Sequence, residues 1–107
     1  MELADFQRWI AETYLERDTA RGELATLAWL IEEVGELAKA TRRGSAEDIA
    51  LEMSDVLAWL ATLANQLDID LAQACERYRD GCPKCGASPC VCDEEGSFEA
   101  LRNPPRG

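Results

Sequence analysis

The chain has 107 residues but no histidine, and no proline occurs before Pro83. Without histidine, the Glu-x-x-His di-iron site found in many helical bundles is excluded. Without proline, and with few glycines before Gly81, residues 3–80 are predicted to form helices joined by short turns. No apolar run approaches the roughly 18 residues that span a membrane, and the first residues do not begin a signal peptide. We therefore expect a cytoplasmic protein with no membrane partner.

Basic residues are also scarce. There are 11 Lys and Arg against 21 Asp and Glu, which gives a formal net charge of −10. A polyanion would need a basic face, so a nucleic-acid partner is not expected, and a small anionic substrate would need bridging cations. The length is near the lower limit for a stable single core, so an oligomer or a structural metal would add stability.

Apolar residues recur at helical spacing and predict an all-α fold, an antiparallel bundle of about four helices over residues 1–80. The first helix is expected to end near Arg17. Asp18 or Thr19 would then cap a second helix that stops at Gly44. The core stripe of this second helix is predicted to contain Leu24, Leu27, Ile31, Val34 and Ala38.

The third helix is expected to start at Ser45, which forms a capping-box pattern with Asp48, and to run to about Gln66. Its core stripe is predicted to contain Ile49, Met53, Val56, Leu60 and Leu63. A short fourth helix is predicted to begin near Asp68 or Asp70 and to end by Asp80. Residues 93–107 are predicted to form a flexible tail.

Carboxylates lie three residues apart on two of these helices: Glu33 with Glu36, and Glu52 with Asp55. Residues i and i+3 share a helix face, so each pair can offer oxygens to one cation. A lone Glu-x-x-Glu is usually an ordinary exposed pair. Here Trp29 lies on the same side of its helix as the glutamates, and Trp59 lies with Glu52 and Asp55.

An acidic and aromatic face favours a buried or liganded site over an ordinary exposed one. Glu32 and Glu36 also repel each other at i, i+4, which costs helix stability. All-oxygen ligands indicate Mg²⁺ or Mn²⁺.

The two motifs, Glu32-Glu33-Val34-Gly35-Glu36 and Glu52-Met53-Ser54-Asp55, resemble those of the MazG-type all-α nucleoside triphosphate pyrophosphohydrolases. The resemblance extends over roughly residues 1–92 and is to a small single-domain branch that often ends in a cysteine cluster. It implies Mg²⁺-dependent cleavage of a ribo- or deoxynucleoside triphosphate to the monophosphate and pyrophosphate, clearing surplus or damaged nucleotides. It also implies a homodimer or higher homo-oligomer with sites near the subunit interface.

Carried over by position, the resemblance implies that Glu33, Glu36, Glu52 and Asp55 bind the metal. Glu32 would either bind a second ion or act as general base toward the attacking water. Trp29 and Trp59 could stack on a base. Arg77 could bind phosphate, although a surface charge near a helix end explains it equally well. Arg21, beside Asp18, is a further phosphate candidate.

Four of the five cysteines cluster near the end of the chain, in Cys82-Pro83-Lys84-Cys85-Gly86 and Cys90-Val91-Cys92. Four thiolates without histidine predict a closed, structural Cys₄ zinc knuckle over residues 81–92. Disulfides or redox chemistry are the alternative. Cys75 stands apart and is expected to be a small buried residue.

A second function is possible for this pattern: a non-catalytic helical module that binds a protein partner through the zinc knuckle. Such a module would have no reason to keep Glu33, Glu36, Glu52 and Asp55 together, because these charges repel one another. The enzyme is therefore the favoured hypothesis.

Overall fold

The computed structural model describes residues 1–93, in which all the regular structure is helical, as predicted. The elements are α1 (Leu3–Arg21), α2 (Glu23–Arg43), α3 (Ala46–Gln66), α4 (Leu71–Cys75) and the 3₁₀ turn η1 (Glu76–Tyr78). These residues divide into two compact units, Met1–Ala74 and a second that begins at Cys75. Apart from Asp93, the predicted tail lies outside the described residues. Within the described part, no helix is long and apolar enough to cross a bilayer.

The first turn of the chain lies at Gly22 and not at Asp18 or Thr19, so the predicted end of the first helix was wrong. Gly22 has φ of +90°, a conformation that residues with a side chain rarely adopt. Asp18 lies inside α1, where its carboxylate pairs with Arg21 instead of capping a new helix. The glycine therefore decides the boundary.

The start of α3 is as predicted. Ser45 Oγ accepts a hydrogen bond from Asp48 N at 3.1 Å, and Ser45 N donates to Asp48 Oδ2 at 3.2 Å. This reciprocal pair satisfies two donors that the helix start would otherwise leave free. Asp70 caps α4 through Gln73 N, at 3.1 Å. The α-helix after this cap is shorter than expected, because its last turn is 3₁₀ in form.

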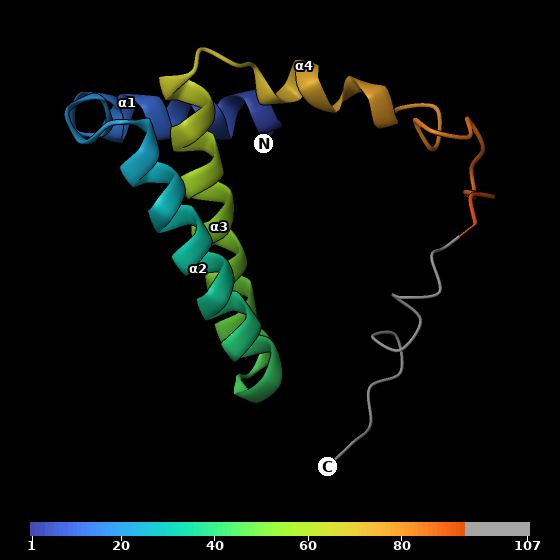
Figure 1. Cartoon of the computed structure of the whole chain (residues 1–107), viewed down its shortest axis with the longest axis horizontal. Coiled ribbons are helices and arrows are strands. Elements are labelled where there is room, and N and C mark those ends of the chain that lie inside the picture. Colours follow the sequence, from blue (N-terminus) through green and yellow to red (C-terminus); the bar gives the residue numbers. More distant parts are fainter. Residues whose placement is uncertain (94–107) are drawn as a thin grey trace. The chain divides into compact units, whose positions relative to one another are not determined.

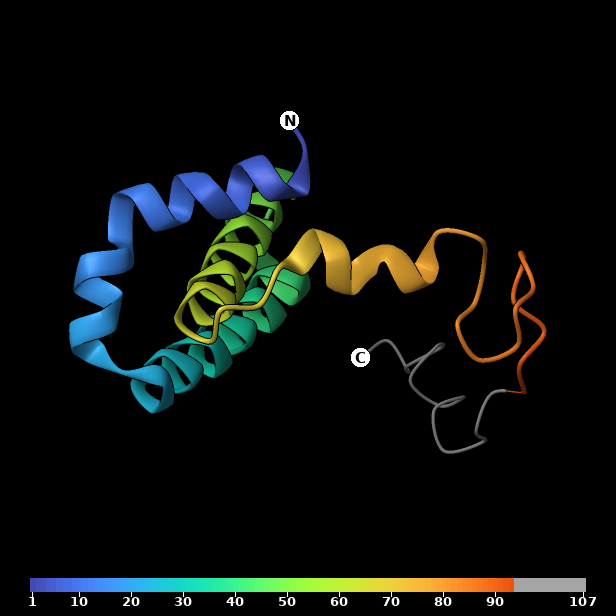
Figure 2. The ribbon, with the colours of Figure 1, turned by 90° about the horizontal axis from the view of Figure 1, so that it is seen from above.

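α2 and α3 form an antiparallel hairpin, and α1 lies across the open end of that hairpin (Figure 1). Figure 2 shows that α1 bends along its length, so that its second half turns toward the start of α2. The antiparallel arrangement predicted for the bundle therefore applies to α2 and α3, while α1 crosses them. The bend brings the end of α1 against the hairpin.

The predicted core stripe of α2 was largely wrong, whereas three of the five residues predicted for α3, Ile49, Val56 and Leu63, are half-buried as expected. Leu24 is 85% exposed and Ile31 64% exposed, and Val34, Met53 and Leu60 are also exposed. α2 instead turns Leu30, Glu33 and Leu37 toward α3, and these are half-buried. The buried side chains of the described residues are small or polar: Asp18, Thr26, Ala61, Thr62 and Ala64.

The spacing of apolar residues alone does not determine which face of α2 packs against α3, because α2 carries apolar residues on two sides. The side of α2 that carries Glu33 faces α3, whereas the more apolar stripe of α2 has no partner in the part of the chain that the structure describes.

Candidate functional site

Three of the predicted carboxylates meet between α2 and α3. Glu33, Glu52 and Asp55 place carboxylate oxygens within 4.8 Å of one another. Glu33 and Glu52 are half-buried and Asp55 is exposed. Oxygens this close can bind a single cation. Of the two predicted i, i+3 pairs, Glu52 and Asp55 both belong to the cluster, whereas Glu33 belongs to it without Glu36.

The cluster carries uncompensated negative charge. The pKa of Glu33 is raised above its ordinary value of 4.5, first because the carboxyl is partly withdrawn from water. The charges of Asp55 and Glu52 raise it further, and those of Glu36 and Glu32 raise it less. A doubly charged cation would relieve this repulsion, and the donor set of carboxylate oxygens suits a hard cation.

Glu36 and Glu32 lie at the edge of the cluster. Both are exposed, and neither belongs to the group of oxygens within 4.8 Å. They are one turn apart on the same side of Glu33, and their charge still acts on its pKa. Their predicted roles are not decided by this geometry.

A cavity of about 740 Å³ opens beside the cluster. Glu33 and Asp55 line it, as do the two predicted aromatic residues Trp29 and Trp59. The two indole rings are stacked, with centroids 6.0 Å apart and planes inclined by 14°. The tryptophans therefore wall the same space that the carboxylates face, which the sequence had predicted from their shared helix faces.

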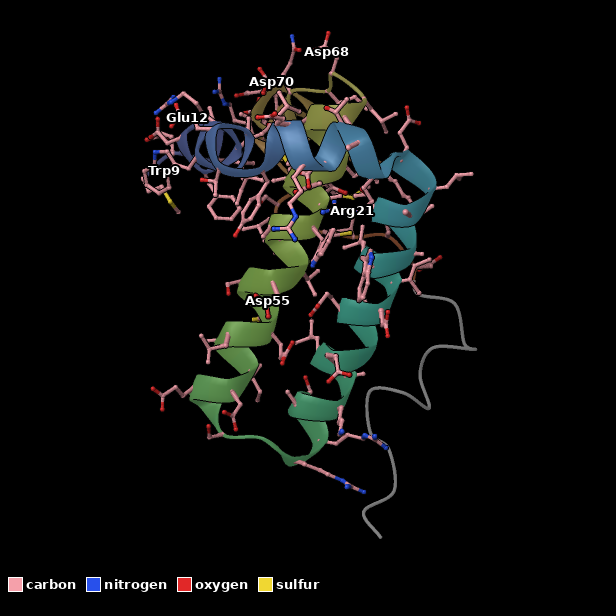
Figure 3. All side chains as sticks on the ribbon, turned by 90° about the vertical axis from the view of Figure 1, so that its left-hand side faces the viewer. Trp9, Glu12, Arg21, Asp55, Asp68 and Asp70 are labelled. Carbon is pink, nitrogen blue, oxygen red and sulfur yellow. The ribbon has the colours of Figure 1, made fainter. Side chains whose placement is uncertain are left out.

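The C-terminal half of α1 forms the opposite wall. Arg21, which was predicted to bind substrate, lines the cavity, and its guanidinium carbon lies 4.9 Å from the Trp59 ring centroid. Arg21 Nη1 donates to Asp18 Oδ1 at 2.7 Å. Figure 3 shows the Arg21 side chain close to the ribbon of α1, and Asp55 on α3 at a greater distance from α1. The cavity thus has two different ends. One is the acidic cluster between α2 and α3, and the other, at α1, carries the ion pair of Arg21 with Asp18.

Several lining residues were missed by the sequence analysis: Tyr14, Arg17, Asp18, Ala20, Ala58 and Thr62. The spacing of Asp18 and Arg21 was visible, but such pairs are common on exposed helices. Only the bend in α1 places this pair beside the tryptophans. Arg77 belongs to the second unit, where its guanidinium carbon lies 5.3 Å from the ring centroid of Tyr78, and its phosphate contact stays a prediction.

The second unit contains a separate possible metal site. The sulfurs of Cys82, Cys85, Cys90 and Cys92 all lie within 4.8 Å of one another, as the predicted knuckle requires. The Cys82–Cys92 sulfurs are 3.7 Å apart and the Cys85–Cys90 sulfurs 3.8 Å apart. All four are free thiols in the structure, and so is Cys75. Cys75 is exposed, so the prediction that it is buried was wrong.

The pKa values of Cys82, Cys85 and Cys92 are shifted in different directions. The backbone N–H of Val91 donates to Cys85 Sγ at 3.5 Å, and such donors lower the pKa of Cys85 to about 6. The backbone around Cys85 and Lys84 lowers the pKa of Cys82 in the same way. Hydrogen bonds with Cys90, Cys85 and Cys82 raise the pKa of Cys92 to about 12. The cluster therefore cannot release all its protons without a cation to balance the charge.

Comparison with known proteins adds a family. Residues 21–84 match the MazG nucleotide pyrophosphohydrolase domain. The matched segment contains the whole acidic cluster and both tryptophans, but it excludes Asp18 and all the clustered cysteines except Cys82. The chain is also similar to the uncharacterized protein YvdC of Bacillus subtilis (strain 168). The two are 28% identical over 97 residues, covering 75% of this chain and 92% of the relative.

Proposed function

The chain belongs to the MazG nucleotide pyrophosphohydrolase domain family, and we propose that it hydrolyses nucleoside triphosphates. The reaction consumes one water and yields the nucleoside monophosphate and pyrophosphate. The observation that carries this proposal is the convergence of Glu33, Glu52 and Asp55 at one end of a cavity walled by Trp29 and Trp59. Acid and aromatic surfaces in one cavity suit a substrate that has a cation-bound phosphate chain and a flat base.

Mg²⁺ fits the carboxylate set, because hard cations prefer carboxylate oxygens and the chain offers no imidazole. Glu33, Glu52 and Asp55 would hold it, with Glu36 completing the set from the next turn of α2. When bound, Mg²⁺ neutralises charge on the phosphates and activates water. Mn²⁺ can serve in the same position.

We assign the remaining carboxylate, Glu32, to the attacking water. It is exposed at the edge of the cluster, one turn from Glu36, where it can accept a proton from a water held beside the phosphates. A second ion at this position is the competing role. The two are separable by experiment, because loss of a base lowers kcat and loss of a metal ligand weakens metal binding.

The cavity also supplies groups for the rest of the substrate. Trp29 and Trp59 give an aromatic surface for the base, and base–aromatic stacking tolerates any base. Arg17 and Arg21 are the cations on the cavity wall in an otherwise acidic chain. They would attract the anionic substrate after the carboxylates have bound their metal.

The test is release of pyrophosphate from a mixed panel of ribo- and deoxynucleoside triphosphates, with Mg²⁺, with Mn²⁺ or with chelator. Wild type should release it only with metal, and Glu52→Gln should abolish release while leaving the protein folded. If wild type releases none under any condition, the chain is better explained as the non-catalytic helical module.

We further propose that the cysteine cluster binds a structural Zn²⁺. A tetrahedral ion with Zn–S bonds of about 2.3 Å has sulfur–sulfur distances of about 3.8 Å. The observed separations of 3.7 and 3.8 Å match this geometry. They are far longer than the roughly 2.05 Å of a disulfide bond. A site with four protein ligands is closed, so its role would be to stabilise the second unit.

We also propose that the chain forms a homodimer. The exposed apolar stripe of α2, which includes Leu24, Ile31 and Val34, has no partner among residues 1–93 of one chain. A stripe of large apolar residues on a helix normally packs against another element. A second copy of the chain would cover it and supply the core that the small buried residues of one copy do not provide.

A further inference from the structure

Asp18 is a buried acid with an unsatisfied oxygen. The residue is 2% exposed, and only one of its carboxylate oxygens is used, by Arg21 at 2.7 Å. The other oxygen, Oδ2, is buried without a hydrogen-bond partner. Among the described residues, one further buried side-chain atom shares this condition: Oε1 of Gln66, whose Nε2 donates to Asp18 O at 2.6 Å. Both unsatisfied atoms are acceptors, and an unsatisfied buried acceptor costs free energy until a donor arrives.

The cavity that Asp18 lines is ordered in layers along the hairpin. Trp29 comes four residues before Glu33, and Trp59 comes four residues after Asp55. Because α2 and α3 are antiparallel, both tryptophans lie one turn, about 6 Å, from the acidic cluster in the same direction. Thr62 lies about 4.5 Å further along α3 in that direction. It lines the cavity together with Asp18 and Arg21 of α1.

This layering gives the substrate a direction. The phosphates belong at the acidic end, where a cation can bridge them to the carboxylates. The base then extends over the tryptophans toward α1. Its outer edge meets Asp18 and Arg21, which offer one acceptor and one set of donors.

We propose that Asp18 selects bases that carry an exocyclic amino group, a step beyond the proposed hydrolysis on which it rests. The amino group of cytosine, adenine or guanine would donate to Oδ2 and satisfy it, once the Asp18 side chain has turned this buried oxygen toward the cavity. Uracil and thymine have their only ring donor between two carbonyl oxygens, so they present partial negative charge to the carboxylate. Asp18 lies outside the segment that matches the family, residues 21–84.

The test compares dCTP with dUTP. Their bases differ at position 4, which carries an amino group or a carbonyl oxygen, and at N3, which is an acceptor in cytosine and a donor in uracil. Wild type should favour dCTP by at least about tenfold in kcat/KM, since a site built around one hydrogen bond rejects an analogue that lacks it. In the same way, dCMP should quench the fluorescence of the cavity tryptophans at lower concentration than dUMP. The binding measurement needs no turnover, so it decides the inference even if hydrolysis fails.

The variant Asp18→Asn gives the sharper result. In this variant Arg21 should continue to donate to the side-chain oxygen of residue 18. The amide N–H₂ then occupies the position of Oδ2, so a hydrogen-bond donor replaces an acceptor there. The preference should then fall at least about tenfold and move toward dUTP. The matched control is Asp5→Asn, which alters the other Asp–Arg pair at i, i+3 on α1, at 2.9 Å from Arg8 and away from this cavity. This control should keep the wild-type preference.

The outcomes separate the two proposals. Equal binding of dCMP and dUMP by wild type would overturn the role of Asp18 and leave the hydrolysis standing. A preference that depends on the sugar, ribose or deoxyribose, and not on the base would also overturn the role of Asp18, because Oδ2 would then accept from a sugar hydroxyl. If no triphosphate is hydrolysed but dCMP is still preferred, the proposed function fails and the selectivity of the cavity stands. If Asp18→Asn does not fold, the two wild-type measurements still decide.

Discussion

Replacing Glu33 with Gln should stabilise the metal-free protein and destroy its response to Mg²⁺. Two unit charges at the 4.8 Å limit of the cluster repel by ~3.5 kcal/mol at an effective dielectric constant of 20. Solvent screening at these partly exposed sites reduces each repulsion to about 1 kcal/mol or less. Removing the charge of Glu33 relieves its repulsion with both Glu52 and Asp55. The free energy of unfolding should therefore rise by up to about 2 kcal/mol in chelator, which corresponds to as much as several degrees in Tm.

The pH dependence has a definite sign. Since the pKa of Glu33 is raised in the folded state, the folded protein binds this proton more tightly than the unfolded chain does. The stability of the metal-free protein should therefore fall as the pH rises from the ordinary value of 4.5 through the raised pKa. Glu33→Gln should lose this part of the pH dependence.

The assay is thermal unfolding of wild type and Glu33→Gln, in chelator and in saturating Mg²⁺. In chelator the variant should be the more stable protein. In Mg²⁺ the order should reverse, because a ligand at 100 times its Kd stabilises wild type by about 2.7 kcal/mol. Glu16→Gln, which removes one exposed charge outside the cavity, should keep the wild-type order. The reasoning is refuted if Glu33→Gln is less stable than wild type in chelator, or if Mg²⁺ stabilises both equally.

Three further substitutions test the other sites. Cys85→Ser should lower the zinc content from about one ion per chain to near zero, whereas Cys75→Ser should retain the ion. Elemental analysis that finds zinc in both variants would contradict the proposed zinc knuckle. Ile31→Glu should convert a dimer to a monomer by placing a charge in the apolar stripe, and light scattering that shows a dimer in both proteins would exclude this face. Glu32→Gln should lower kcat by at least about a hundredfold with the Mg²⁺ half-saturation unchanged, while weaker Mg²⁺ binding would make Glu32 a metal ligand.

The parts of the fold that depend on local chemistry were predictable. The capping pair of Ser45 and Asp48 located the start of α3, and the i, i+3 carboxylates located the acidic cluster. Ser45 and Asp48, like Glu52 and Asp55, are three residues apart, so helical geometry alone brings their side chains together. Glu33 joins Glu52 and Asp55 because α2 packs against α3. The C-x-x-C and C-x-C spacings located the cysteine cluster, because each places two thiols a few residues apart within a turn or loop.

The parts that depend on packing were not predictable. The stripe at Leu24 and Ile31 has the right period for a core, but a period does not say whether the partner is in the same chain. Aspartate is a residue type that often caps helices, but α1 continues past Asp18. The boundary between α1 and α2 lies four residues later, at Gly22, which adopts a positive φ. The cavity wall on α1 depends on the bend of that helix, which no local pattern in the sequence records.

The central claim is tested most directly by identifying the products formed from a nucleoside triphosphate with Mg²⁺. Phosphorus NMR of the reaction mixture distinguishes the products without coupling enzymes. The account predicts monophosphate and pyrophosphate in equal amounts, and none of either in chelator. Diphosphate with inorganic phosphate, or products that form equally without metal, would contradict it.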